Sequence, residues 1–177
     1  MYNILLLTVA LLATVCAGDY KPVDEVDLTK YMGHWYEVYG DKFNNIFQGK
    51  GKCSTADYDL LDDGRVYVVN QQLNSENMEE SIPGYAYYKD DDCCGYLTVQ
   101  LEGTPEAPYW IIELGPIVDY YYDYAIVSDN NRLSLYVLAR NVDDFYKFYN
   151  DQVLNSLDTM GFNKKWNSPV VMNQTNC

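Results

Sequence analysis

Hydrophobic and polar residues alternate with a period of two in several segments of the chain, and Gly, Asp or Asn bounds most of these segments. This spacing is typical of half-buried strands, because successive side chains on a strand point to opposite faces. The alternation predicts eight strands, over residues 35–39, 54–61, 65–73, 84–88, 96–101, 109–114, 121–128 and 133–140. Asp62-Asp63-Gly64 fits a hairpin turn between the second strand and the third.

One segment departs from this alternation and predicts a helix over residues 143–160. Its apolar residues lie three or four apart, at Tyr146, Tyr149, Val153, Leu157 and Met160. This is the spacing of one helix face, and Gly161 is a suitable residue to end the helix. Eight sequential strands and one helix predict an all-β protein, an up-and-down antiparallel barrel over residues 33–140 with the helix packed outside and a tail over 161–177. A barrel of eight strands encloses room for one small ligand.

The N-terminal segment is hydrophobic from residue 4 to residue 12, with Thr8 as its only polar residue. A run of this length is too short to span a bilayer and suits the core of a signal peptide. Val15-Cys16-Ala17 favours cleavage after Ala17, while Val15 is a poor residue before a lipid-modified cysteine. We therefore expect residues 1–17 to be removed and residues 18–177 to form one secreted, extracellular domain.

The charge of the chain excludes several kinds of partner. There are 26 Asp and Glu residues against 12 Lys and Arg residues, which gives a formal net charge of −14 at pH 7. Nucleic acid and anionic lipid both need a basic face, so we expect the chain to bind neither. The sequence after the signal segment has no second long apolar run, so we also expect no stable membrane insertion. The only histidine is His34, expected on the surface, and a zinc site has little else to build on. With no nucleophile-elbow pattern either, we expect no metal and no catalytic role.

The cysteines and one asparagine are candidates for covalent modification. Four cysteines remain after removal of the signal peptide, at Cys53, Cys93, Cys94 and Cys177. A secreted chain is exposed to oxidising conditions, in which disulfides form. Asn173-Gln174-Thr175 is an N-glycosylation acceptor near the C-terminus, unless the triplet occurs there by chance.

Three segments together resemble the sequence motifs of the lipocalin family. Tyr31-Met32-Gly33-His34-Trp35-Tyr36-Glu37-Val38 resembles the Gly-x-Trp motif of the first strand, and Leu135-Tyr136-Val137-Leu138-Ala139-Arg140 resembles the motif of the last strand. Residues 119–127 resemble the middle motif, with its Asp shifted by about one residue relative to Tyr124-Ala125.

Further marks are similar to the lipocalin group of apolipoprotein D and the insect bilin-binding proteins. They are Cys53-x-x-Ala56-x-Tyr58, Val68-x-Asn70, Gly84-x-Ala86, Pro108-Tyr109-Trp110 and Gly161-Phe162. Their order along the chain matches the order of the predicted elements, so the resemblance covers nearly all of residues 26–177.

The resemblance implies roles for the motif residues and for two of the cysteines. It places Trp35, on the strand that Gly33 begins, at the closed end of the barrel, with Arg140 over its ring as a structural cation–π pair. It also implies a disulfide between Cys53 and Cys177. Cys93 and Cys94 then either pair with each other, stay free or link two chains. In the last case the protein would be a disulfide-linked dimer.

The register implied by the resemblance, combined with strand alternation, defines an expected ligand site. The expected ligand-binding residues are Glu37, Phe43, Phe47, Ala56, Tyr58, Val68, Asn70, Ala86, Leu97, Val99, Leu101, Tyr109, Ile111 and Tyr136. Among them Phe43 and Phe47 are expected to border the mouth. Glu37 either receives a polar ligand group or accepts hydrogen bonds from nearby tyrosines, and we favour the second.

The predicted function is that of a carrier for a small hydrophobic molecule such as a bilin, retinoid, sterol or fatty acid. No cofactor is required, and a bound chromophore or lipid would be the ligand itself. One alternative is a lipid-modifying isomerase, which in the lipocalin-type prostaglandin isomerase depends on a free cysteine in the cavity. Another alternative is a secreted lipocalin that binds a protein through its loops.

Overall fold

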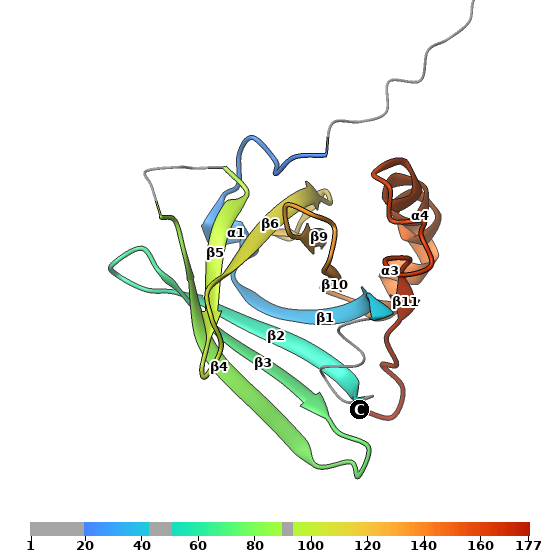
Figure 1. Ribbon diagram of the computed structural model, residues 1–177, viewed down its shortest axis with the longest axis horizontal. Helices are drawn as coiled ribbons and strands as arrows, with labels where there is room; N and C mark the ends of the chain where they lie inside the picture. Colours follow the sequence, from blue (N-terminus) through green and yellow to red (C-terminus); the bar gives the residue numbers. More distant parts are fainter. Residues whose placement is uncertain (1–19, 43–50, 90–93) are drawn as a thin grey trace, which may run out of the picture.

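The computed structural model describes residues 20–42, 51–89 and 94–177. Within these residues a single antiparallel sheet curves round until its last strand, β10, pairs with its first, β1 (Figure 1). The eight barrel strands are β1 (Gly33–Gly40), β2 (Lys52–Leu60), β3 (Val66–Leu73), β4 (Glu79–Tyr87), β5 (Tyr96–Leu101), β6 (Ala107–Leu114), β9 (Tyr124–Ser128) and β10 (Leu135–Ala139). The predicted closed, up-and-down barrel is confirmed.

Some sequence predictions lie outside the described residues. They are the signal peptide over 1–17, the mouth residues Phe43 and Phe47, and Cys93. Cys94 is described and carries a free thiol. No helix among the described residues has the length and apolar character needed to cross a membrane.

Strand alternation divides the apolar residues into two separate clusters. One cluster lies inside the barrel and includes Trp35, Val68 and Leu97. The other lies between the sheet and the C-terminal helices and includes Ile126 and Val137. Neighbouring positions on one strand thus serve different clusters, as a period of two requires.

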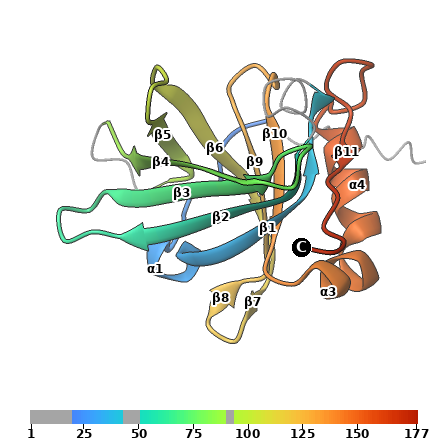
Figure 2. The same cartoon turned by 90° about the horizontal axis from the view of Figure 1, so that it is seen from below.

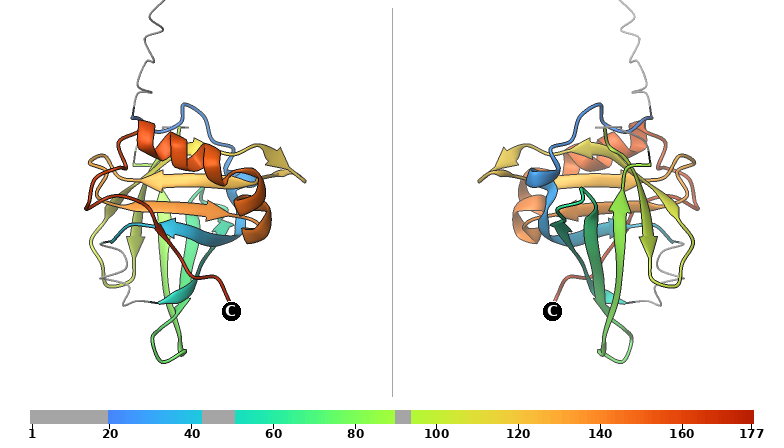
Figure 3. Two further views of the ribbon diagram at one scale, coloured as in Figure 1. Left: turned by 90° about the vertical axis from the view of Figure 1, so that its right-hand side faces the viewer. Right: turned by 90° about the vertical axis from the view of Figure 1, so that its left-hand side faces the viewer.

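The C-terminal helical segment packs on the outside of the barrel, as predicted, but it is not one helix. It consists of α3 (Val142–Phe148) and α4 (Asn150–Thr159), which lie along the outer face of the barrel beside β9 and β10 (Figure 3). The predicted helical segment is interrupted at Tyr149, whose φ of −120° departs from helical geometry, although the amides of Tyr149 and Val153 keep helical hydrogen bonds to the carbonyl oxygens of Phe145 and Tyr149. Phe145 of α3 and Val153 and Leu157 of α4 all bury their side chains against the sheet.

Three other elements differ from the predicted ones. β4 begins at Glu79 instead of residue 84, because residues 79–83 continue the ladder with β3 although they do not alternate between polar and apolar. The predicted strand over 121–128 is divided into β8 (Tyr121–Tyr122) and β9, and β8 forms a hairpin with β7 (Ile117–Val118) that projects from the barrel (Figure 2). A short helix, α1 (Leu28–Tyr31), precedes β1 and was not predicted.

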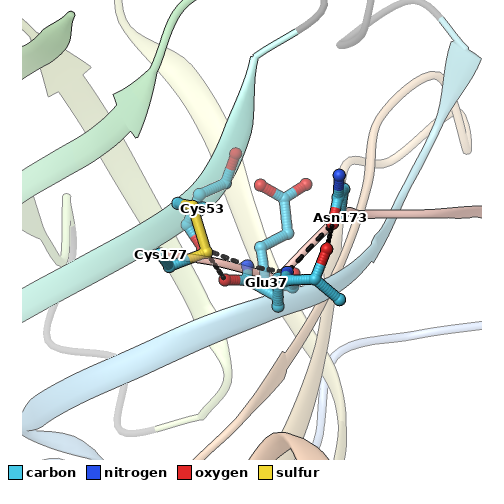
Figure 4. Close-up of a disulfide and its surroundings, with 7 residues drawn as sticks. Glu37, Cys53, Asn173 and Cys177 are labelled. Carbon is cyan, nitrogen blue, oxygen red and sulfur yellow. Dashed lines mark hydrogen bonds between the residues drawn. A yellow bond between two sulfur atoms is a disulfide. The ribbon is translucent and has the colours of Figure 1, made fainter. Parts of the chain in front are cut away.

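The C-terminal tail adds a further strand and a covalent link to the barrel. β11 (Val170–Val171) pairs with β1 at Tyr39 and Gly40. Beyond it, Cys177 is bonded to Cys53 on β2, with a Cα–Cα distance of 5.5 Å (Figure 4). The disulfide implied by the resemblance is therefore present, and it holds the tail against the barrel wall.

Replacing both Cys53 and Cys177 by Ala should lower the free energy of unfolding by about 3 kcal/mol. The disulfide joins residues separated by 124 positions, so it removes much of the conformational freedom of the unfolded chain. Urea unfolding of the double variant beside wild type measures the loss. A Cys94→Ala variant, which removes a free thiol, is the control; an equal loss in that variant would contradict the assignment.

Candidate functional site

The interior face of the barrel is built by side chains from all eight of its strands. Its buried residues on these strands are Trp35, Ala56, Tyr58, Val66, Val68, Ala86, Leu97, Ile111, Ala125, Val127 and Leu138. The partly buried Val99, Leu101, Tyr109 and Tyr136 pack against them. Asn70 is partly buried and lies opposite Ala56 on β2, which places both side chains on the interior face. The structure therefore brings together most of the residues expected to line a ligand site.

Trp35 and Arg140 close one end of this interior. The guanidinium carbon of Arg140 lies 3.6 Å from the centroid of the fully buried Trp35 ring. Its Nη1 donates to the carbonyl oxygen of His34 at 2.7 Å, and its Nη2 donates to those of Tyr31 and Met32 at 3.1 and 2.7 Å. Burial lowers the pKa of Arg140 to about 10, so the group remains charged at neutral pH. Arg140 thus ties the segment before β1 to the end of β10.

The backbone conformation at position 33, in the first motif, requires a glycine. Its φ is +95°, a region that residues with a side chain rarely adopt. A Cβ at this position would also lie 3.4 Å from Nη1 of Arg140. The glycine therefore admits the guanidinium to the closed end of the barrel.

Three tyrosine hydroxyls form a chain beside this closed end. The Tyr109 hydroxyl lies 2.8 Å from that of Tyr31 and 3.0 Å from that of Tyr58. Burial raises the pKa of Tyr58 to about 12 and raises the pKa values of Tyr31 and Tyr109 well above their usual range, so all three are neutral at physiological pH. Three hydroxyl protons serve two internal hydrogen bonds, which leaves one proton for an acceptor elsewhere.

Glu37 is the one acidic side chain placed on the interior face of β1. It lies directly opposite Leu138 of β10, whose side chain belongs to the interior cluster. Its side chain is 5% exposed, and its Oε1 accepts no hydrogen bond from the residues that the structure describes. Burial, together with the nearby charge of Asp41, raises the pKa of Glu37 to about 8, against a smaller lowering by the Ser54 hydroxyl. The prediction that tyrosines donate to this carboxyl is wrong for Oε1, which accepts from no tyrosine among the described residues, while the hydroxyls of Tyr58 and Tyr31 each share a hydrogen bond with that of Tyr109.

The tail closes the gap between β1 and β2 beside Glu37. Gln174 Nε2 donates to the backbone carbonyl oxygens of Glu37 and Ser54, at 2.8 and 2.7 Å. The amide of Cys53 donates to the carbonyl oxygen of Asn173 at 2.8 Å. In Figure 4 the carboxyl group of Glu37 points away from the disulfide. Asn173, the expected glycan acceptor, is exposed, and its Oδ1 accepts a hydrogen bond from the backbone amide of Thr175.

Two grooves on the described surface lie outside the barrel interior. One, of about 490 Å³, runs between α3 and the tail and is lined by residues such as Tyr36, Tyr146 and Gln174. The other, of about 380 Å³, lies on β3 to β5 beside Tyr67 and Tyr85. Of the residues predicted to bind ligand, only Leu101 borders either of these grooves.

The sequence predictions missed two buried polar residues of the site. Tyr31 is 2% exposed and contributes its hydroxyl from α1, a helix of four residues that is too short to show a periodic pattern. The only local indication was Asp27, whose side chain caps this helix by accepting from the Thr29 amide. Asp41, at the end of β1, is fully buried and accepts from the backbone amide of Leu135 at 2.8 Å.

His34 and the other potential metal ligands give no metal site among the described residues. His34 is exposed, and its Nδ1 lies 2.7 Å from Oδ1 of Asp57 on the neighbouring strand. Across residues 20–42, 51–89 and 94–177, no three His, Cys, Asp or Glu side chains gather in a way that could hold a metal ion.

The closed barrel, its Trp–Arg pair and its external helices define a barrel of the lipocalin type. A family model described as a lipocalin-like domain matches residues 26–167. The chain belongs to the lipocalin family.

Individual relatives agree with this assignment. The chain is 32% identical over 144 residues to the outer membrane lipoprotein Blc of Vibrio cholerae, with 79% of this chain and 81% of that protein covered. It is 37% identical over 129 residues to apolipoprotein D of Cavia porcellus, with 68% of this chain but only 64% of that relative covered. The structure of insecticyanin from Manduca sexta has a similar fold, with a TM-score of 0.64 at 19% identity over 88% of this chain and 84% of that one.

Proposed function

We propose that this protein is a secreted carrier that binds one small, mainly hydrophobic molecule inside the barrel. The observation that carries the proposal is the interior face, which is apolar on every strand and has a few polar groups at Glu37, Asn70 and the tyrosine hydroxyls. Binding sites for small molecules commonly combine apolar walls with a few polar groups that orient the ligand. A bilin, retinoid, sterol or fatty acid is the proposed class of ligand.

The proposal assigns no catalytic role to the chain. An isomerase of the alternative kind would use a free cysteine in the cavity. The sulfur of Cys53, the barrel cysteine considered for that role, is bonded to Cys177. A free-thiol assay on the folded protein, with the labelled cysteine located by peptide mapping, separates the two functions. The carrier should show no reactive thiol inside the barrel, whereas labelling of the free Cys94 bears on neither function.

Secretion is part of the proposal and is supported by two features of the chain. The first is the hydrophobic N-terminal segment, which suits a signal peptide. The second is the disulfide between Cys53 and Cys177, since structural disulfides persist in oxidising compartments.

Replacing Tyr136 by Ala should weaken retinoid or bilin binding at least tenfold, about 1.4 kcal/mol. Tyr136 lies opposite Gly40 near the end of β1 and packs against the interior cluster. Replacing Leu97, which is 3% exposed, by Trp should block the cavity. Fluorescence titration with retinol or biliverdin measures both effects, and circular dichroism checks the fold.

Two outward-facing residues supply the matched controls. Tyr85→Ala removes a tyrosine that is 39% exposed, and Leu60→Trp enlarges a leucine that is 42% exposed, so neither should alter affinity. If Tyr136→Ala and Leu97→Trp both bind like wild type, the ligand does not lie in the barrel, and binding of a protein by the loops becomes the better hypothesis. Native mass spectrometry of protein from its own source would weigh a retained ligand directly.

A further inference from the structure

The carboxyl group of Glu37 lies inside the barrel without a positive partner. The register between β1 and β10 is continuous over Tyr36 and Glu37, and their opposite residues, Ala139 and Leu138, belong to the outer and inner clusters respectively. Glu37 therefore shares the interior face with Leu138 and with Trp35, two positions earlier on β1. None of the ion pairs formed within the described residues includes Glu37.

The surroundings of this carboxyl add negative charge but no cation. The Ser54 hydroxyl is near enough to lower the pKa of Glu37, by less than burial and Asp41 raise it, yet Oε1 accepts no hydrogen bond from the described residues. Asp41 approaches from the end of β1, and Tyr58 approaches from β2. In the tail, the uncharged side chain of Gln174 donates to the backbone carbonyl oxygen of Glu37 and not to its carboxyl group. The buried cation of the closed end, Arg140, donates to backbone carbonyl oxygens. A Cβ at Gly40 would lie 2.6 Å from Oε1, so the absence of a side chain there leaves room for the carboxyl.

A buried carboxyl without a cation beside it is costly. Burying an acid without a partner costs several kcal/mol, whereas a cation or a strong donor at the same place recovers that cost. The walls around it are apolar, with Leu138 opposite and Trp35 deeper in the barrel. The missing partner would thus have an apolar body and one positively charged donor.

We propose that Glu37 is the anchor for a protonated amine, so that the barrel carries a small lipophilic primary or secondary amine. This inference rests on the proposed function, because it names the ligand class of the same interior site. The ammonium donates to Oε1 of Glu37, and the hydrocarbon part of the ligand lies against the interior cluster. The spare hydroxyl proton of the Tyr31, Tyr58 and Tyr109 chain remains for an acceptor group on the same ligand.

The anchor also couples ligand binding to a proton. The raised pKa of Glu37, about 8, means that the carboxyl is mostly protonated at pH 7 without ligand. An ammonium beside it favours the charged form, so binding at pH 7 should release about one proton. Asp41, Tyr58 and Arg140 are the other titratable groups facing this region, and Tyr58 and Arg140 titrate near pH 12 and pH 10.

The test compares 1-naphthylmethylamine with its neutral counterpart 1-naphthylmethanol by calorimetry. Wild type should bind the amine at least tenfold more tightly than the alcohol at pH 8, a difference of about 1.4 kcal/mol. Glu37→Gln should lose at least tenfold in affinity for the amine and less than twofold for the alcohol. Titration at pH 7 in phosphate and in Tris, which differ in ionisation enthalpy, should show proton release with wild type only.

The control Glu80→Gln removes an exposed carboxylate from β4 and should leave amine binding unchanged. Equal amine affinity in wild type and Glu37→Gln, or binding that persists in Leu97→Trp, would overturn the inference and indicate attraction to the acidic surface. Failure of the alcohol, retinol and the amine alike to bind wild type would instead overturn the proposed function. Binding of the alcohol and retinol without any preference for the amine would overturn only the anchor.

Discussion

Replacing Arg140 by Ala should lower the free energy of unfolding by about 4 kcal/mol. The guanidinium lies 3.6 Å from the Trp35 ring centroid and 5.1 Å from that of Tyr121, so two aromatic contacts are lost together. The carbonyl oxygens of His34, Tyr31 and Met32 also lose their donor. A fully buried unsatisfied carbonyl group costs about 1–3 kcal/mol. The carbonyl groups of Tyr31 and Met32 are partly buried and that of His34 is exposed, so water recovers part of this cost.

Arg65 offers a matched comparison on the surface of the same barrel. Its guanidinium lies 4.6 Å from the Tyr85 ring centroid and pairs with Asp63, but its side chain is 47% exposed. Exposed contacts of this kind contribute less than about 1 kcal/mol, so Arg65→Ala should scarcely move the urea midpoint. If Arg140→Ala unfolds like wild type yet no longer binds a retinoid, then Arg140 acts in ligand binding, and the structural role assigned to it here is wrong.

The sequence predicts the barrel well where alternation is regular and a motif fixes one residue per strand. β5 was predicted over the same residues that the structure shows, because Leu97, Val99 and Leu101 alternate with polar neighbours. Trp35 and Arg140, identified from the family resemblance, fix which face of β1 and β10 points inward. With those anchors, a period of two assigns the remaining interior residues.

The parts that were not predictable depend on backbone geometry that side-chain patterns do not encode. At the tip of the β7–β8 hairpin, Asp119 and Tyr120 have φ values of 48° and 85°, unusual for residues other than glycine. The alternation over residues 121–128 fits one continuous strand and does not show that Tyr121 and Tyr122 pair with β7 across this turn. In the same way, Tyr149 fits a helical spacing and yet ends α3, because the spacing of apolar residues does not show the change in its φ.

The polar part of the site was predicted less well than its apolar walls. Alternation places Glu37 inward but does not show which neighbours reach its carboxyl. Those neighbours come from distant parts of the chain: Asp41 lies beyond a bulge in β1, and Gln174 lies in the tail. The tyrosine hydroxyl chain likewise joins α1, β2 and β6, a meeting that only the closed barrel reveals.

Replacing Glu37 by Gln should stabilise the protein at pH 9 by roughly 3–5 kcal/mol and leave its stability at pH 4 nearly unchanged. The pKa of Glu37 is about 8 in the folded protein, against an ordinary value of 4.5 in the unfolded chain. Between these two values the folded state holds a proton that the unfolded state has released. The contribution of Glu37 to the free energy of unfolding is therefore fully present below pH 4.5. It declines as the pH rises and is lost above pH 8.

The interval from pH 5 to pH 9 isolates this effect from the other shifted groups. Asp27, whose pKa is lowered to about 2, has already lost its proton there, while Arg140 at about 10 and the buried tyrosines have not yet lost theirs. Urea unfolding of wild type should thus show a decline across this interval that Glu37→Gln lacks. Glu80→Gln should keep the wild-type slope, because hydrogen bonds from Asn74 and Gln72 lower the pKa of that exposed carboxyl. Parallel profiles for wild type and Glu37→Gln would mean that water or a cation already compensates the carboxyl, and the site would then hold no unpaired acid for a ligand to meet.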